Sequence, residues 1–294
     1  MKKIIVTGIS GFLGKHFVDA PRSAWNIHGI YHRSVFMEDA ESFWALDLGD
    51  LEYTRVFFDQ IEPEAVVHLA AISKPADCLA DPDYSYKINV VVPAYLAQYA
   101  GARNIPFYFA STDLVFDGKA GPYDYSDHPN PINLYGKQKY EAERRILDIH
   151  PGAAVLRLPL LYGYTPGRHN FLIEWIDQLR AGQQITAFTD EYRSPLYVRD
   201  AVRGILQLLR KRKVGIWHLG GPERLSRYEM AIQITEALGL DPALVLGKSQ
   251  SEVDLKTPRP ADVSLICPKA SAADFYARKF ANGLKASLKR YDQS

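Results

Sequence analysis

Tyr135 and Lys139 lie four positions apart in "NLYGKQKYEAERR" (residues 133–145). On a helix, residues at i and i+4 share one face, so the phenol and the ammonium would be neighbours. A free tyrosine titrates near ~10, and a nearby cation favours its phenolate and brings proton transfer within reach of neutral pH. The pair can therefore act as an acid with the cation that tunes it, or be two polar residues on a solvated helix. With 18 tyrosines in the chain, spacing alone does not decide.

A glycine-rich segment near the N-terminus offers a site for phosphate groups. "VTGISGFLGKHF" (residues 6–17) holds Gly8, Gly11 and Gly14, directly after a strand pattern and at the start of a helix pattern. In such a loop the first glycine makes the tight turn, the second lets backbone approach a pyrophosphate, and the third lets helix and strand pack closely. The helix N-terminus presents N–H groups to the phosphates. We predict dinucleotide binding here, against the alternative of a purely structural turn.

The end of the next predicted strand indicates which dinucleotide binds. An NAD site usually carries Asp or Glu there, whereas this chain has "HRS" with Arg33. A cation suits the 2′-phosphate of NADP, so NADP is favoured over NAD. The alternative is that Arg33 is an exposed loop residue. Asp47, in "ALDLGD" after a short strand, is placed to accept from the adenine amino group.

The elements that position these residues alternate along the first half of the chain. Expected strands cover residues 3–7, 26–31, 65–71, 106–111 and 153–158, and expected helices cover residues 12–20, 51–61, 84–102 and 133–149. This alternation indicates βαβ units and a parallel sheet covered on both faces. The predicted fold class is α/β, a Rossmann-like doubly wound sheet. Ligands bind outside the carboxyl ends of such strands, which is where Thr112 and the glycine loop are expected.

The pattern changes after about residue 160. Ser226 and Glu229 form a capping box at the start of a helix, and Gly239 follows its end. We expect residues 1–160 to form an NADP-binding domain and residues 161–294 a smaller substrate-binding lobe, partly packed back on the sheet.

Composition argues against several classes of protein. The formal net charge is +1, which gives no general basic field for nucleic acid, and the basic run at residues 210–213 is interpreted as the solvated end of a helix. Two cysteines are too few for a disulfide framework or a structural zinc site, and the eight histidines show no metal spacing. No apolar run reaches the ~18 residues that span a bilayer, and "MKKIIVTG" does not resemble a signal peptide. We expect a cytoplasmic protein that binds no metal, nucleic acid or membrane.

Several motifs together resemble the extended short-chain dehydrogenase/reductases. "TGISGFLG", "DLGD", "HLAA", "STDLVFDG", "LYGKQK" and "RLPLLYG" occur in that family's order and spacing. Within it, "STDLVFDG", "NPINLYGKQKYEAE", "RSPLYVRDAV" and "RPADVSL" look most like the dTDP-4-dehydrorhamnose reductases, which make dTDP-L-rhamnose from the 4-keto sugar. The resemblance covers nearly the whole chain.

The resemblance implies NADPH-dependent reduction of a 4-keto nucleotide sugar. Tyr135 would protonate the forming alkoxide, Thr112 would hydrogen-bond the same oxygen, and Lys139 would also hold the nicotinamide ribose. The implied cofactor-binding residues are Gly8, Ser10, Gly11, Phe12, Leu13, Gly14, Arg33, Asp47, Leu48, Ala70, Ala71, Tyr135 and Lys139. The implied substrate-binding residues are Ser111, Thr112, Lys74, Arg193 and Arg259.

Each of the smaller candidates has a structural alternative. Ser111 can be a backbone cap and Lys74 a surface residue. Arg193 and Arg259 suit a nucleotide diphosphate, because a guanidinium can contact two oxygens at once, but each can instead form a local salt bridge. His68 is interpreted as a hydrogen-bonded core histidine.

Two leucines depart from the rhamnose-forming pattern. Leu114 replaces a tyrosine and Leu160 a tryptophan that would face substrate, so the sugar stays open. No glutamate follows Asp113, which argues against the 4,6-dehydratases of the superfamily. A nucleotide-sugar 4-epimerase remains an alternative. So does a non-catalytic, NADP-binding regulatory subunit like that of methionine adenosyltransferase. Relatives often form homodimers, some through magnesium, but no magnesium ligands can be matched here.

Overall fold

The chain forms two compact units that are each built from separated segments. The computed structural model describes residues 2–19, 25–32, 42–168, 170–255 and 257–293. The first unit contains residues 1–112, 134–157 and 202–217, and the second contains residues 113–133, 158–201 and 218–294. This differs from the single boundary expected at residue 160, because the segment at 202–217 returns to the sheet of the first unit.

A seven-stranded sheet forms the centre of the first unit. Its order is β11-β6-β5-β4-β1-β2-β3, and the pairings β1–β2, β1–β4, β2–β3 and β4–β5 are parallel. The strands are β1 (Lys2–Thr7), β2 (Trp25–Tyr31), β3 (Phe43–Ala45), β4 (Ala65–His68), β5 (Phe107–Thr112), β6 (Ala154–Leu158) and β11 (Gly215–His218). The predicted α/β doubly wound fold is confirmed. The order reverses between β1 and β4, which is the switch point where such sheets bind ligands.

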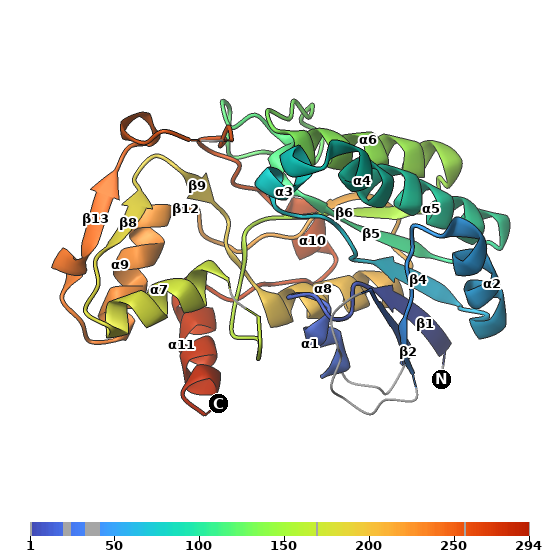
Figure 1. The fold of residues 1–294 in the computed structure, drawn as a ribbon, viewed down its shortest axis with the longest axis horizontal. Helices are drawn as coiled ribbons and strands as arrows, with labels where there is room; N and C mark the ends of the chain where they lie inside the picture. The colour runs from blue at the N-terminus through green and yellow to red at the C-terminus, as the bar shows by residue number, and fades with distance from the viewer. Residues whose placement is uncertain (1, 20–24, 33–41, 169, 256, 294) are drawn as a thin grey trace. The chain divides into compact units, whose positions relative to one another are not determined.

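Helices cover both faces of this sheet (Figure 1). Alternate strand residues, such as Phe107 and Phe109, join a core cluster with α2 (Leu51–Ile61), α5 (Val92–Ala102) and α6 (Leu134–Ile149). Tyr108 points to the other face, where its hydroxyl donates to the carbonyl of Leu208 in α8 (Val198–Arg210) at 2.9 Å. The short α1 (Lys15–Val18) follows β1.

The helix expected over residues 84–102 is interrupted. It consists of α4 (Pro82–Tyr86), a π-helical turn at Lys87–Val91 and α5, preceded by α3 (Pro75–Ala80). Pro93 has no N–H to bond the carbonyl four residues earlier, at Asn89, so the regular ladder is broken there. Buried Asn89 instead holds the loop after β4, bonding the Ile72 backbone N–H at 2.9 Å and carbonyl at 3.0 Å.

The second unit has its own core of Tyr162, Trp175, Ile234, Phe280 and neighbouring apolar residues. Among its described residues, it contains three two-stranded sheets and several helices. The strands are β7 (Leu161–Tyr162), β8 (Ile185–Phe188), β9 (Tyr192–Arg193), β10 (Leu196–Tyr197), β12 (Leu225–Ser226) and β13 (Val245–Lys248). The helices are α7 (Phe171–Arg180), α9 (Arg227–Ala237), α10 (Pro268–Ala272) and α11 (Phe280–Tyr291).

The predicted capping box is confirmed at the start of α9. The Glu229 N–H donates to the Ser226 hydroxyl at 3.0 Å, and the Ser226 N–H donates to the Glu229 carboxylate at 2.6 Å. Gly239 has φ +68° just beyond the helix end. In the part of the chain that the structure describes, no helix is long and apolar enough to cross a bilayer.

Candidate active site

Thr112, Tyr135 and Lys139 lie on two packed elements of the first unit. Thr112 is the last residue of β5, and Tyr135 and Lys139 occupy successive turns of α6, which packs on β5. All three side chains are buried. The Nζ atom of Lys139 lies 3.8 Å from the centroid of the Phe109 ring. A cation and a phenol on one buried helix face can together hold and release a proton.

Burial changes the charge state of two groups beside this site. Desolvation lowers the pKa of Lys139 to about 7, while the charges of Glu143 and then Cys78 act to raise it. Burial, and then the charge of Lys139, lower the pKa of His68 to about 3. Groups whose pKa values are strongly shifted by burial and a charged neighbour cluster at functional sites.

His68 has the role that the sequence predicted, a hydrogen-bonded core histidine. Its Nδ1 lies 2.8 Å from the hydroxyl oxygen of Thr7. That oxygen also accepts from the backbone N–H groups of Leu69 at 3.2 Å and Ala70 at 3.3 Å. The bonds fasten the start of the loop after β4 to the end of β1.

The glycine loop has little room for side chains. Gly8 has φ +70°, and a Cβ there would lie 2.8 Å from the backbone nitrogen of Ala70. A Cβ on Gly14 would lie only 2.1 Å from the Gly8 carbonyl oxygen, whereas one on Gly11 would lie 3.1 Å from it. These close approaches fit the turn that a dinucleotide pyrophosphate requires at this place.

The other predicted cofactor residues lie around this loop and the neighbouring strand ends. Ser10, Phe12 and Leu13 belong to the turn between β1 and α1, and Ala70 and Ala71 follow β4. Exposed Asp47 accepts from the Gly49 N–H at 2.8 Å and lies 3.8 Å from His32 Nε2. Leu48 is buried next to it. Arg33, on which the preference for NADP depended, lies outside the described residues.

Two predicted substrate residues of the first unit have different environments. The Ser111 hydroxyl donates to the buried carboxylate of Glu143, so it is engaged with α6. Lys74 is exposed at the position before α3, in the loop after β4.

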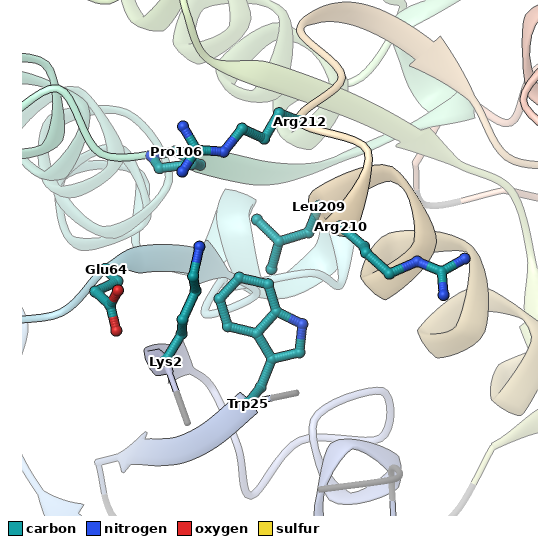
Figure 2. Close-up of a pocket in the computed structure, with 7 residues that line it drawn as sticks. All are labelled: Lys2, Trp25, Glu64, Pro106, Leu209, Arg210 and Arg212. Carbon is teal, nitrogen blue, oxygen red and sulfur yellow. The ribbon is translucent and has the colours of Figure 1, made fainter. Parts of the chain in front are cut away.

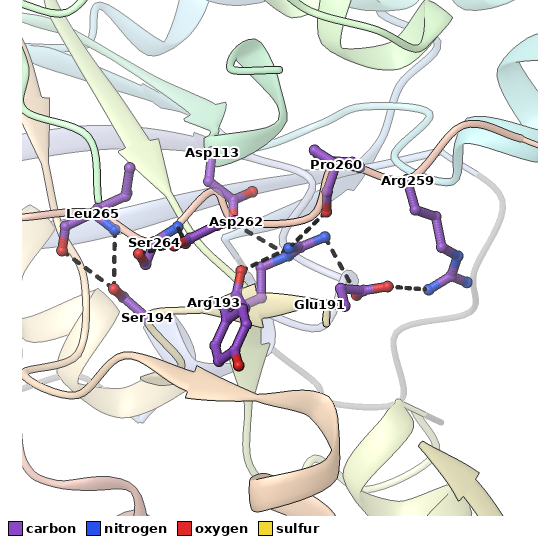
Figure 3. Close-up of polar contacts among 10 residues, drawn as sticks. Asp113, Glu191, Arg193, Ser194, Arg259, Pro260, Asp262, Ser264 and Leu265 are labelled. Carbon is purple, nitrogen blue, oxygen red and sulfur yellow. Dashed lines mark hydrogen bonds and ion pairs between the residues drawn. The ribbon is translucent and has the colours of Figure 1, made fainter. Parts of the chain in front are cut away.

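Arg193 and Arg259 meet at Glu191 in the second unit (Figure 3). Arg193 is buried and donates to the carbonyls of Tyr192 at 2.7 Å and Pro260 at 3.3 Å. Its guanidinium lies 3.3 Å from Glu191 and 3.8 Å from Asp113. Arg259 is half-exposed and 3.2 Å from Glu191. Arg193 therefore forms the local ion pairs that were its structural alternative, whereas Arg259 keeps an open face.

The sequence did not indicate three charged residues that have buried polar atoms in the two units. Glu143 and Arg157 form a fully buried ion pair in the first unit, at 2.8 Å. Arg227 of the second unit lies over Phe171 and Trp175, and its Nη1 is buried without a hydrogen-bond partner among the described residues. Of the three, only Glu143 could have been identified from spacing, because it continues the i, i+4 series of Tyr135 and Lys139.

A pocket of about 530 Å³ opens elsewhere in the first unit (Figure 2). Lys2 and Trp25 begin β1 and β2, and Glu64 and Pro106 directly precede β4 and β5, so it lies at the amino ends of the strands. Leu209, Arg210 and Arg212 complete the lining. Ligands of a doubly wound sheet bind at the opposite, carboxyl ends. We therefore expect the cofactor and the substrate to bind elsewhere. Arg210 and Arg212, which belong to the basic run, are exposed.

The chain is similar to known proteins over almost its full length. The family model described as "RmlD substrate binding domain" matches residues 1–293. The beta subunit of methionine adenosyltransferase 2 from Xenopus tropicalis is 31% identical, over 98% of this chain and 87% of that protein. The probable low-salt glycan biosynthesis reductase Agl14 of Haloferax volcanii is 30% identical, over 87% of this chain and 86% of that protein.

Solved structures share the fold. The dTDP-4-dehydrorhamnose reductase of Bacillus anthracis, in complex with NADP, has a TM-score of 0.87 and 24% identity, covering 99% of this chain and 100% of that one. A hypothetical dTDP-4-dehydrorhamnose reductase from Sulfolobus tokodaii has a TM-score of 0.84 and 29% identity, covering 96% and 99%. A UDP-glucose 4-epimerase from Thermotoga maritima has a TM-score of 0.85 and 23% identity, covering 99% of each chain.

Proposed function

The chain belongs to the RmlD substrate-binding domain family, and from this premise we propose that it is an NADPH-dependent reductase of a 4-keto nucleotide sugar. The observation that carries the proposal is the buried Tyr135–Lys139 pair on α6, beside the end of β5 at Thr112. Two relatives, from Haloferax volcanii and Sulfolobus tokodaii, carry reductase names at 30% and 29% identity.

In the proposed mechanism the side chains manage a proton while the carbonyl is reduced. NADPH, when bound, supplies the hydride that reduces the carbonyl carbon. Tyr135 donates its phenolic proton to the alkoxide oxygen that forms, and Thr112 donates a hydrogen bond to the same oxygen. The Lys139 ammonium favours the phenolate left on Tyr135, which lowers the cost of the transfer. Solvent then returns a proton to Tyr135.

The glycine loop supports a dinucleotide as the cofactor. Gly8, Gly11 and Gly14 leave space where side chains would collide, so backbone N–H groups can approach the pyrophosphate. The proposal of NADP over NAD rests on the cation at Arg33, in the position where an NAD site usually has a carboxylate.

We propose that cations of the second unit bind the substrate's diphosphate. Arg259 is half-exposed, pairs with Glu191 and lies over the Phe188 ring at 5.7 Å. Arg227 has a buried nitrogen with no hydrogen-bond partner among the described residues. Arg193 positions Arg259 indirectly, because it pairs with Glu191 and donates to the Pro260 carbonyl next to Arg259. Leu160 packs partly against the apolar core of that unit, so the sugar would meet an aliphatic surface where the rhamnose-forming reductases have tryptophan.

A second candidate function is that of a subunit that assists another enzyme. The similarity to the beta subunits of methionine adenosyltransferase 2, at 31% identity over nearly the whole chain, favours it. Such a protein would bind the cofactor at the same glycine loop, so the fold does not distinguish the two candidate functions. They are distinguished by whether the protein consumes NADPH in the presence of a keto sugar.

The deciding experiment adds NADPH and NADH separately to the protein with a panel of 4-keto nucleotide sugars and follows the loss of absorbance of the reduced cofactor. We expect consumption of NADPH with one sugar, and slower consumption of NADH. Stoichiometric NADPH binding without consumption across the panel would support the subunit function. A changed sugar at constant absorbance would instead indicate a 4-epimerase.

A further inference from the structure

Glu143 is a buried carboxylate that the proposed reaction does not use. It lies one helical turn beyond Lys139 and two beyond Tyr135, so the three side chains follow one face of α6. Both Glu143 and Lys139 are 1% exposed. A charge removed from water to this extent persists only when it is paired and hydrogen-bonded, so its partners determine its role.

The partners of Glu143 join three elements of the first unit. Arg157 of β6 donates from Nη2 to Oε2 at 2.8 Å and from Nε to both carboxylate oxygens at 3.2 Å. Ser111 of β5 donates its hydroxyl to Oε1. Because Ser111 directly precedes Thr112, the carboxylate fastens α6 to the end of β5 and to β6 at the level of the proposed site.

Glu143 also carries the negative charge that counts most for Lys139. Burial lowers the pKa of Lys139 to about 7, and the charge of Glu143 is the larger of the two that oppose this decrease. The groups that interact electrostatically with Lys139 include Glu143 on α6, Cys78 on α3 and His68 on β4. Tyr135 lies one turn earlier on α6, and Arg157 on β6 is paired with Glu143. Of these, the Glu143 carboxylate has both oxygens bound by donors from two strands, which hold it in place.

We propose that Glu143 is a positioning residue for the Tyr135–Lys139 pair: held by Arg157 and Ser111, its carboxylate sets α6 against the end of β5 and keeps the Lys139 ammonium protonated. A neutral side chain of the same shape supplies the packing but not the charge. The role in catalysis rests on the proposed function, whereas the effect on Lys139 is a property of the folded protein alone.

The test replaces Glu143 by an isosteric amide, Glu143→Gln. Lysine labelled with ¹³C and ¹⁵N at the side-chain terminus allows the Lys139 resonance to be followed by NMR from pH 5 to 10, with Lys139→Arg for its assignment. We expect a midpoint near 7 in the unaltered protein, as burial of the amine dictates, and a midpoint lower by about one pH unit in Glu143→Gln. As the pH rises and Lys139 loses its proton, the affinity of Glu143→Gln for NADPH should therefore begin to weaken at a lower pH than that of the unaltered protein.

A matched control lies on the same helix. Glu141→Gln makes the same chemical change at a side chain that is 41% exposed and pairs with Arg145. We expect no change in the Lys139 midpoint or in the pH profile of NADPH binding for this variant. An equal shift in both variants would overturn the proposal, because it would indicate a general loss of charge rather than the fixed carboxylate.

The double variant Glu143→Gln/Arg157→Met separates charge from folding. It removes both members of the buried pair, so we expect a melting temperature above that of Glu143→Gln. Because Arg157→Met also removes a positive charge, we expect the Lys139 midpoint of the double variant to lie between those of Glu143→Gln and the unaltered protein. A midpoint in folded Glu143→Gln equal to that of the unaltered protein would show that Glu143 is only structural. Failure of every keto sugar to react would refute the proposed function, while the Lys139 titration would still decide the role of Glu143.

Discussion

The chemistry of the proposed site depends on how completely Tyr135 and Lys139 are removed from water. Lys139 has the aromatic face of Phe109 at 3.8 Å and a pKa lowered to about 7 by burial, so its ammonium can change charge near neutral pH. An exposed lysine would stay protonated throughout that range. We therefore expect activity at this site to depend on pH near neutrality, because of the surroundings of this single residue, Lys139.

Replacing Tyr135 by phenylalanine removes the proposed proton donor and keeps the ring. We expect kcat for reduction to fall by ~10²–10⁴, the usual contribution of a positioned acid. The dissociation constant for NADPH, measured by fluorescence titration, should stay within a few-fold. Tyr140→Phe, five positions along the same helix, is the control and should retain normal turnover. Single-turnover traces of Tyr135→Phe with a near-normal rate would refute the assignment.

We expect His68 to make the folded state sensitive to acid. Its pKa is lowered from 6.5 to about 3, mainly by burial, so between these values the unfolded chain binds a proton that the folded chain does not. The contribution of neutral His68 to the free energy of unfolding is therefore fully present above pH 6.5. It is lost as the pH falls toward 3, at up to about 1.4 kcal/mol per pH unit. His68→Gln cannot titrate, so its free energy of unfolding in urea should fall less between pH 6.5 and 4.

The control for this prediction is His150→Gln, at a partly exposed histidine that bonds the Ile105 carbonyl at 3.1 Å. It should retain the acid dependence of the unaltered protein. If His68→Gln loses stability with acid as steeply as the control does, His68 is not the group responsible.

At the scale of elements, the β1–α1 turn and the π-helical turn each position backbone for a ligand. Gly14 lies where the loop folds back on Gly8, with no room for a Cβ. Asn89 holds Ile72 and also donates to the Gln138 side-chain oxygen of α6 at 2.8 Å. The loop after β4 is thereby held in place by α6 and the π-helical turn, and the Thr7 hydroxyl fastens the start of this loop to the end of β1.

Alanine substitutions at Gly14 and Gly11 should have different effects, the first on the stability of the fold and the second on the affinity for NADPH. Gly14→Ala places a Cβ 2.1 Å from the Gly8 oxygen, so we expect a melting temperature lower by several degrees, equivalent to about 1–3 kcal/mol of overpacking. Gly11→Ala meets that oxygen at 3.1 Å, which small movements relieve, so its melting temperature should change little. Its affinity for NADPH should nonetheless fall about tenfold or more, because the methyl group stands where the pyrophosphate approaches.

Gly101→Ala provides the reference for these two variants. Gly101 lies in α5, away from the loop, and its added Cβ would be 3.3 Å from the His150 side chain. Scanning calorimetry and isothermal titration with NADPH should find normal binding. Normal NADPH affinity in a folded Gly11→Ala protein would contradict the role given to the loop.

At the scale of the whole molecule, the chain passes several times between its two units. Residues 113–133 leave the first unit directly after β5, and residues 202–217 return to it as the second part of α8 and most of β11. Neither unit is a continuous piece of sequence. Cutting the chain near residue 160 would therefore remove the edge strand β11 from the sheet, and we expect no stable fragment.

Cofactor binding should stabilise the entire protein. A ligand that binds only the folded state adds about 2.7 kcal/mol at a hundred times its dissociation constant. We expect thermal unfolding followed by circular dichroism to show this increase with NADPH, and a smaller one with NADH at the same concentration. Equal increases with both would contradict the preference for NADP, and no increase with either would refute dinucleotide binding.

The linear sequence determined those features that depend on local pattern. Short apolar runs between helical stretches predicted β1, β2, β4, β5 and β6, because such runs are readable without knowledge of neighbours. The glycine spacing, the capping box at Ser226 and the Tyr135–Lys139 pair were identifiable for the same reason. Family motifs then assigned the chemistry that these residues are expected to perform.

Only the tertiary structure decided which charged side chains are buried away from water and which residues they pair with. Ser111 was expected near substrate but donates to Glu143, and Arg193 forms ion pairs with Glu191 and Asp113. Arg157 came from a strand and Glu143 from a helix, so no spacing linked them. Burial and pairing arise from residues distant in sequence, and they fix the pKa of Lys139, on which the proposed site depends.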